Sequence, residues 1–300
     1  MPDIDAPVLS QPLPGGSAGA HVSLRPLLTG EMGAPRGFLH REDGGASKAR
    51  AIGRGLSKKI ETWVPCPIFL AEHPTAGYVL VDTGLPPAVA HDPRAALGRM
   101  GASIYAVRAK EDQPLPARLR SLGIEAAQIK TVVMTHLHFD HAGALSELPG
   151  ATVVVSKPEW RAAHGGRALA RGYIKRQYDQ AYDYRLIDFE ANSVNSFASF
   201  GRSFDLFGDG SVILVSTPGH TWGHLSVVLK LKDREALICG DAIYDRKTLD
   251  DSSLPLTTAD DHIFRRSLRE IRAYAQMTPS ALVIPGHDGR AFAKLAPYYD

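Results

Sequence analysis

The chain has 300 residues, of which 44% are hydrophobic and 22% are charged, and its formal net charge is +2. No run of about 20 apolar residues occurs, so we expect no segment to span a membrane. No clustered basic stripe of the kind that binds nucleic acid is present either. The length suits one large domain or a compact pair, and the apolar fraction can fill a sizeable core.

The start of the chain and its two cysteines indicate the compartment. Residues 1–20 are rich in Pro, Gly and Ser, and they lack the basic and apolar regions of a secretory signal. We therefore expect a flexible N-terminal segment, a single domain over residues 21–300, and a cytoplasmic protein. Cys66 and Cys239 have neither the pattern of a disulfide framework nor the spacing of a thiolate zinc site. Both are interpreted as small buried residues.

The first half of the expected domain consists mainly of strands. A helix is predicted over 116–122, where Gly123 follows as its C-terminal cap, and a second helix begins at Pro158. The ranges 30–57 and 98–115 are interpreted as long loops. Apolar, β-branched runs bounded by turn residues predict strands over 22–28, 66–70, 78–82, 129–134 and 151–155.

The second half begins with a range of weak periodicity, 165–203, which we interpret as a helical insertion plus loop. Apolar residues near the helical period then predict a helix over 263–274. Strands are predicted over 212–215, 225–231, 236–239 and 281–284.

Four of the predicted strands end in a short loop that carries a possible metal ligand. These ligands are His136, His220, Asp241 and His287. Side chains at strand ends on one rim of a sheet converge, and a rigid scaffold then fixes their geometry. The pattern predicts one shared site.

A compact cluster of ligand-type residues follows the strand that ends at residue 134. His136, His138, Asp140 and His141 place three imidazoles and a carboxylate in one short loop. Zinc-like cations bind these groups, and catalytic sites leave a position open for water. Alternate loop residues can face one way, so the first two can share one ion while the other two turn toward a neighbouring ion. Neither pair completes a coordination shell, so more distant ligands are required.

The cluster, Thr-His-Leu-His-Phe-Asp-His-Ala-Gly over residues 135–143, resembles the His-x-His-x-Asp-His signature of the metallo-β-lactamase fold superfamily. The resemblance covers about residues 60–290 and implies an α/β fold, an αββα four-layer sandwich with the metals at one edge. Four supporting motifs occur in family order: Val81-Asp82-Thr83-Gly84, Thr217-Pro218-Gly219-His220, Gly240-Asp241 and Pro285-Gly286-His287.

The resemblance also implies a ligand set for two divalent metal ions, with zinc first and iron, cobalt or manganese as alternatives. A hydroxide between the ions would be the nucleophile, because bound metal lowers the pKa of water toward about 7. One ion would take His136, His138 and His220; the second would take Asp140, His141 and His287; Asp241 would bridge both.

Two stretches resemble the N-acyl homoserine lactonases within the superfamily. They are residues 138–143 and Asp241-Ala242-Ile243-Tyr244. The resemblance implies that Tyr244 stabilises the substrate oxyanion and that Asp140 assists proton transfer during opening of the lactone ring. Ring opening passes through an oxyanion, which a phenol donor can stabilise. Asp82 and His224 are interpreted as groups that orient the ligands without binding metal themselves.

Other hydrolases remain alternatives on the same dinuclear site. The substrate could be another small ester, a thioester, an organophosphate or a β-lactam. A binding protein that kept the fold without the chemistry is disfavoured, because all seven candidate ligands are present. The ranges 30–57 and 98–115 border the substrate site without aligning to the lactonases, so acyl-chain preference is open. The sequence does not decide between a monomer and a homodimer.

Overall fold

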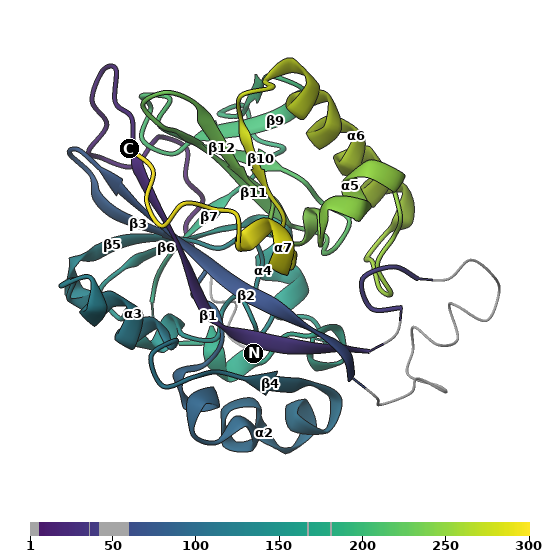
Figure 1. Cartoon of the computed structure of the whole chain (residues 1–300). Helices are drawn as coiled ribbons and strands as arrows, with labels where there is room; N and C mark the ends of the chain where they lie inside the picture. Colours follow the sequence, from purple (N-terminus) through teal and green to yellow (C-terminus); the bar gives the residue numbers. More distant parts are fainter. Residues whose placement is uncertain (1–5, 36, 42–59, 167, 181) are drawn as a thin grey trace.

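The computed structural model describes residues 6–35, 37–41, 60–166, 168–180 and 182–300 (Figure 1). Two β-sheets form its centre, one of seven strands and one of six, within these residues. Most of the first predicted loop, residues 42–57 of the range 30–57, lies outside this description.

The seven-stranded sheet has the order β4-β1-β2-β3-β5-β6-β7. The pairs β1–β2, β2–β3 and β1–β4 are antiparallel, whereas β3, β5, β6 and β7 run parallel to one another. Its strands are β1 (Ser23–Pro35), β2 (Ile60–His73), β3 (Gly77–Val81), β4 (Ala106–Arg108), β5 (Ile129–Val133), β6 (Thr152–Ser156) and β7 (Asp183–Ile187).

The six-stranded sheet has the order β13-β12-β11-β10-β9-β8. Its neighbours are antiparallel except for the parallel pair β12–β13. Its strands are β8 (Asn195–Phe197), β9 (Phe200–Asp205), β10 (Val212–Ser216), β11 (Leu225–Lys230), β12 (Glu235–Ile238) and β13 (Leu282–Ile284).

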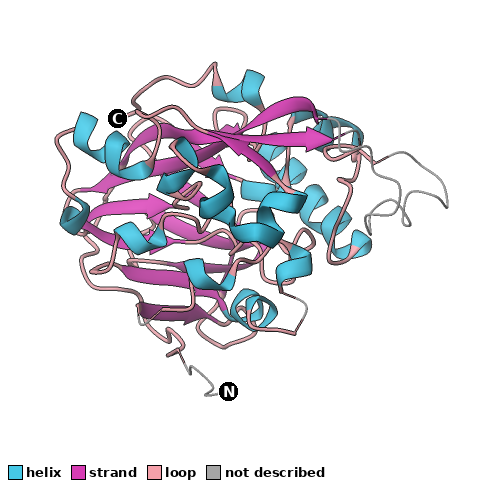
Figure 2. Cartoon of the chain, turned by 90° about the horizontal axis from the view of Figure 1, so that it is seen from below, coloured by secondary structure: helices cyan, strands magenta, loops and turns pink. Residues whose placement is uncertain are grey.

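Helices cover the outer faces of the sheets, and in Figure 2 they lie in front of the strands. The α-helices are α2 (Pro93–Ile104), α3 (Leu115–Ser121), α4 (Lys157–Ala163), α5 (Arg246–Asp251), α6 (Asp261–Met277) and α7 (Gly289–Phe292). Short 3-10 turns are η1 (Pro87–Ala90), η2 (Ala126–Gln128), η3 (Leu145–Glu147), η4 (Leu169–Arg171), η5 (Lys175–Gln177) and η6 (Gly240–Ala242).

Strand alternation separates the core into layers. In β6, Val153 and Val155 pack toward α3 and α4, whereas Val154 packs between the sheets. In β10, Leu214 also packs between the sheets, and Val215 packs against the α6 side. Because successive side chains of a strand point to opposite faces, each sheet contributes to two layers. The order helix, sheet, sheet, helix confirms the predicted α/β αββα sandwich (Figure 1).

Three sequence-based assignments differ from the structure. Strand β1 continues to Pro35 instead of ending at residue 28, because its second half pairs with both β2 and β4. The expected loop 98–115 contains most of α2, which is kinked at Gly98 (φ 73°), and the strand β4. The described residues of the range 165–203 form two 3-10 turns, the strands β7 and β8 and the start of β9 instead of a helical insertion. The alternation of apolar and polar residues in this range is too short to predict these strands.

The N-terminal segment lies along the edges of both sheets. The N–H of Leu9 donates to the carbonyl of Leu186 at 2.8 Å, and that of Leu13 donates to Leu206 at 2.7 Å. The side chains of Leu9 and Leu13 pack against the layer between the sheets. Leu9 and Leu13 therefore connect part of this segment to the sheets, and the flexibility of residues 1–20 stays a prediction. No helix in the described part of the chain is long and apolar enough to cross a bilayer.

Candidate metal centre

Five strands of the two sheets end at one edge and deliver polar side chains there. Asp82 follows β3, the 136–141 loop follows β5, and His220 comes after β10. Asp241 lies in η6 directly after β12, and His287 follows β13. The sequence predicted this convergence of strand ends, and the seven candidate ligands lie together in the structure.

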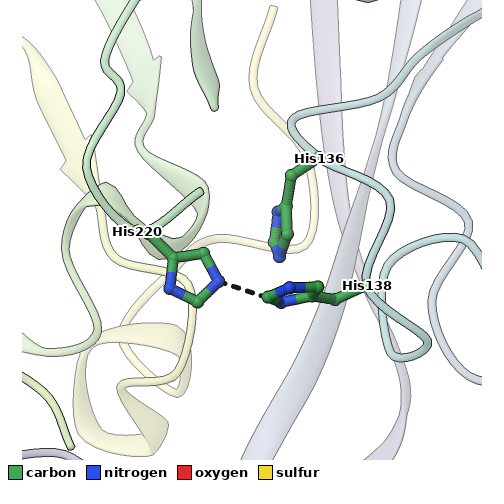
Figure 3. Close-up of side chains that lie close together, drawn as sticks. All are labelled: His136, His138 and His220. Carbon is green, nitrogen blue, oxygen red and sulfur yellow. Dashed lines mark hydrogen bonds between the residues drawn. The ribbon is translucent and has the colours of Figure 1, made fainter. Parts of the chain in front are cut away.

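The first group consists of His136, His138 and His220, whose ligand atoms lie within 4.8 Å of one another. Figure 3 shows the three rings turned toward a common point, with His220 arriving from the opposite loop. Nε2 of His220 lies 3.0 Å from Nδ1 of His138. His136 and His220 are buried and His138 is half-buried, so the group reaches the surface on the His138 side.

The second group surrounds Asp140. Its Oδ2 lies 3.5 Å from Nε2 of His287 and 3.7 Å from Nε2 of His141. All three side chains are buried. Asp140 and His287 also form a ligand-type trio with Cys66, again within 4.8 Å. The sequence had assigned Cys66 only to the core.

Asp241 lies between the two groups. Its Oδ2 is 3.3 Å from Nε2 of His220 and 4.0 Å from Nε2 of His136, which belong to the first group. Its Oδ1 is 3.2 Å from Nε2 of both His141 and His287, which belong to the second. One oxygen faces each group, as a bridging carboxylate requires.

Several ligand-type atoms at the centre have no hydrogen-bond partner among the described residues. They are Nε2 of His136, His141 and His287 and Oδ1 of Asp241, all buried. Leaving buried polar atoms unpaired is costly, and most such atoms in native proteins are paired. Imidazole nitrogens and carboxylate oxygens are the groups that zinc-like cations bind. The residues present therefore fit bound divalent cations.

Asp82 orients the histidine loop, residues 136–141, through hydrogen bonds. Its carboxylate accepts hydrogen bonds from the N–H and Oγ1 of Thr135, each at 2.8 Å, and from Nδ1 of His141 at 2.7 Å. The Asp82 backbone has φ 59°, a left-handed conformation that residues other than Gly seldom adopt and that Asp and Asn tolerate best. The hydrogen bonds leave Nε2 of His141 facing the second group.

His224 holds the backbone of Asp241. Its Nε2 accepts a hydrogen bond from the N–H of Asp241 at 2.9 Å, and its Nδ1 lies 3.0 Å from Oγ1 of Thr217. Gly240 adopts φ 51°, and a Cβ there would lie 2.8 Å from Nε2 of His224. Glycine at this position thus permits the close approach that fixes Asp241.

Glu159 was missed as a functional residue, because the sequence indicated only a helix beginning at Pro158. The side chain is fully buried, and its Oε1 accepts from the N–H of Leu137 at 3.0 Å and from the Tyr173 hydroxyl at 2.9 Å. Leu137 lies between two candidate ligands, and the Tyr173 ring packs edge-on against His138. No local motif marks Glu159 in the sequence, because its position beside the histidine loop depends on how α4 packs there.

The pKa values of the candidate ligands shift in different directions. Burial lowers the pKa of His136 well below its ordinary value. Burial also acts to lower the pKa of His141, but the carboxylates of Asp82 and Asp140 outweigh it and raise that pKa well above its ordinary value. Burial acts to raise the pKa of Asp241, but the imidazoles of His287 and His141 hold it well below its ordinary value. Asp241 is thus held as a carboxylate.

Tyr244 lies against residues of both groups. Its hydroxyl is 3.2 Å from Nδ1 of His220, and its ring centre is 5.4 Å from that of His287. The ring of Phe38 stacks on the ring of Tyr244, with 5.6 Å between the two ring centres. Burial and the charges of Asp241 and Asp140 raise the pKa of Tyr244 well above its ordinary value, so the phenol keeps its proton and can donate a hydrogen bond.

Comparison with known proteins agrees with this architecture. The sequence model of the Metallo-beta-lactamase superfamily matches residues 62–287, which hold all seven candidate ligands. The chain belongs to this superfamily. The superfamily implies divalent metal ions, and the cluster of His and Asp side chains is where this chain would bind them. The predicted family is thereby confirmed.

Several relatives are named N-acyl homoserine lactonase. The chain is 33% identical over 243 residues to N-acyl homoserine lactonase AttM of Azorhizobium caulinodans, covering 79% of this chain and 88% of the relative. It is 32% identical over 241 residues to the protein of the same name from Agrobacterium fabrum, covering 79% and 87%. These relatives confirm the predicted resemblance to the lactonases.

A solved structure of an N-acyl homoserine lactone hydrolase, with N-hexanoyl-L-homoserine at its catalytic metal centre, has the same fold. The TM-score is 0.72 at 20% sequence identity, and the match covers 93% of this chain and 98% of that one.

Proposed function

We propose that this protein hydrolyses the lactone ring of N-acyl homoserine lactones at a site for two divalent metal ions. The relatives named N-acyl homoserine lactonase support this substrate class. The observation that carries the proposal is the position of Tyr244, whose hydroxyl and ring lie between a residue of each ligand group. A substrate carbonyl placed over the centre would therefore meet a phenol donor.

The ligand sets follow from the two groups around Asp241. His136, His138 and His220 would hold one ion, Asp140, His141 and His287 would hold the other, and Asp241 would contact both. Zinc is the expected metal, because mixed imidazole and carboxylate sites suit it. Bound divalent ions supply a water of lowered pKa and positive charge beside a developing oxyanion.

Tyr244 and Asp140 carry out the remaining steps of the hydrolysis. Hydrolysis joins a water oxygen to the lactone carbonyl carbon, and the ring C–O bond then breaks to give a carboxylic acid and an alcohol. Tyr244 donates a hydrogen bond to the oxyanion that develops on the carbonyl. Asp140 takes the proton of the attacking water and returns it to the leaving alkoxide. The product is an N-acyl homoserine.

A substrate panel on the metal-loaded protein tests the proposal. Acid release from N-acyl homoserine lactones of different chain lengths would be followed beside a simple ester, a thioester, a phosphotriester and a β-lactam. We expect the lactones to have the highest kcat/KM. Strong turnover of another substrate without lactone turnover would contradict the proposal.

His138→Ala and Asp241→Asn provide the matched site controls. Each variant removes one candidate ligand, so each should hold fewer than two metal ions per chain and lose turnover. Retention of two ions and full activity in both variants would show that the ligand assignment is wrong.

A further inference from the structure

We propose that the thiolate of Cys66 is an additional ligand of the second metal position, which therefore takes a thiophilic cation such as zinc in preference to manganese. This inference rests on the dinuclear site proposed above. It adds a ligand type, sulfur, that the seven His and Asp candidates lack.

The placement of Cys66 provides the first argument. Its Sγ, a carboxylate oxygen of Asp140 and a ring nitrogen of His287 all lie within 4.8 Å of one another, and all three residues are buried. Ligand atoms at about 2.0 to 2.3 Å from a common zinc ion lie within about 4.5 Å of one another. The trio therefore needs only small side-chain shifts to share an ion. Nε2 of His287 has no hydrogen-bond partner in the described residues, and it already points at the carboxylates of Asp140 and Asp241, at 3.5 and 3.2 Å.

Strand β2 holds this trio together through its backbone. The carbonyl of Pro65, next to Cys66, accepts a hydrogen bond from Nδ1 of His287 at 2.8 Å. The carbonyl of Cys66 itself accepts one from Oγ1 of Thr29 at 2.7 Å, where the pairing of β1 with β2 shifts register. Since Nδ1 of His287 is used in this way, its Nε2 faces the acidic residues. The contact between β2 and the loop after β13 thus brings sulfur to the centre.

The other cysteine of the chain shows what a purely space-filling thiol looks like. Cys239 lies in the apolar cluster under α6, and its Sγ is 3.7 Å from the carbonyl oxygen of Leu237. Cys66 also borders an apolar cluster, but unlike Cys239 it places its Sγ within 4.8 Å of ligand atoms of Asp140 and His287. A neutral thiol gains little from such neighbours, whereas a cation that binds sulfur and carboxylate together would be stabilised by both.

Ligand chemistry then limits the metal. Thiolate is a soft ligand that favours zinc and similar cations, whereas manganese and magnesium prefer oxygen ligands. A coordinating thiol is deprotonated outright, and this adds negative charge to the second position. Among the candidate metals zinc, iron, cobalt and manganese, a thiolate ligand therefore disfavours manganese at the second position.

Cobalt substitution gives a readout that does not depend on turnover. The protein would be loaded with two equivalents of Co(II), and its near-ultraviolet absorption would be recorded together with the bound metal per chain. We expect a sulfur-to-cobalt charge-transfer band in the unaltered protein. The band should disappear in Cys66→Val and persist in Cys239→Val, which removes the only other thiol. In competition between zinc and manganese, Cys66→Val should take up at least tenfold more manganese than the unaltered protein.

The outcomes separate this inference from the proposed function. Two bound cobalt ions without a charge-transfer band in the unaltered protein would overturn the role of Cys66 and leave the dinuclear site standing. A band that persists in Cys66→Val would do the same. Failure to bind cobalt at all would overturn both. Because the unaltered protein alone can exclude the thiolate, the test holds even if Cys66→Val folds poorly.

Discussion

The carboxylate of Asp82, directly after strand β3, lies 2.7 Å from Nδ1 of His141, although the two residues are 59 positions apart in the chain. The same carboxylate binds the N–H and hydroxyl of Thr135, one residue before the loop's first candidate ligand. One buried acid thus positions the loop and the ring of His141. Each bond that it accepts fixes the direction of a side chain at the centre.

Replacement of Asp82 by Asn should weaken metal binding without removing a ligand. Asn tolerates the left-handed backbone, but its amide cannot serve all three donors. Groups that orient ligands in this way typically contribute about 10- to 100-fold in metal affinity. Competition with a chromogenic chelator would measure the change. Asp92→Asn, at the exposed start of α2, is the control and should keep the original affinity.

Replacement of Tyr244 by Phe should lower kcat for the lactone while leaving the bound metal unchanged. Loss of one oxyanion donor costs about 10²-fold or more in kcat. Steady-state kinetics and metal analysis on the same samples would separate the two effects. Tyr184→Phe loses a hydroxyl bonded to the carbonyl of Tyr178 and should keep full activity. An unchanged kcat in the Tyr244 variant would argue against the phenol donor.

Removal of the metal should lower stability as well as activity. The buried centre brings acidic and imidazole groups together, and a ligand that binds only the folded state stabilises it by mass action. At a free metal concentration about 1,000 times Kd, this stabilisation is about 4 kcal/mol. Thermal unfolding before and after treatment with a chelator, and after zinc is restored, would measure it. An identical Tm in all three samples would contradict a metal centre.

Acid should release the metal at a higher pH than ordinary histidine ligands would. Burial acts to lower the pKa values of His141 and His287, but the carboxylates around them raise both in the metal-free protein. A protonated imidazole cannot bind metal, so protons compete more strongly as the pH falls. Metal retained after buffer exchange at descending pH would show the midpoint. Asp82→Asn removes one of the charges that raise the pKa of His141, so NMR titration of the metal-free variant should show a lower pKa for that imidazole.

Replacement of Glu159 by Ala should destabilise the histidine loop. The N–H of Leu137 and the hydroxyl of Tyr173 would lose their acceptor, and leaving a buried donor unpaired costs about 1–3 kcal/mol. Glu159→Gln keeps an acceptor oxygen and should lose less. Urea unfolding of the metal-loaded protein would compare the two variants. Glu111→Ala removes an exposed acid and serves as the control.

Local patterns in the sequence predicted much of the fold and most of the centre. Residues 136–141 are close in the chain, and each distant candidate directly follows a buried strand, so strand geometry alone made them converge. The helix over 116–122 and its cap at Gly123 appear as α3 and a glycine with φ 71°, because both depend on neighbouring residues. The strand β4 and the helix α2 were missed, because β4 has only three residues and α2 is interrupted at a glycine.

Tertiary structure alone decided which groups meet across long separations. Cys66 and Glu159 had no local motif, and their positions beside His287 and Leu137 depend on how β2 and α4 pack against loops elsewhere in the chain. Asp241 directs one oxygen to each ligand group only because η6 follows β12 between the two loops. The sequence determined the types of ligand and the strands that carry them. Packing determined their distances, because contacts between distant segments follow from the whole core and not from any local period.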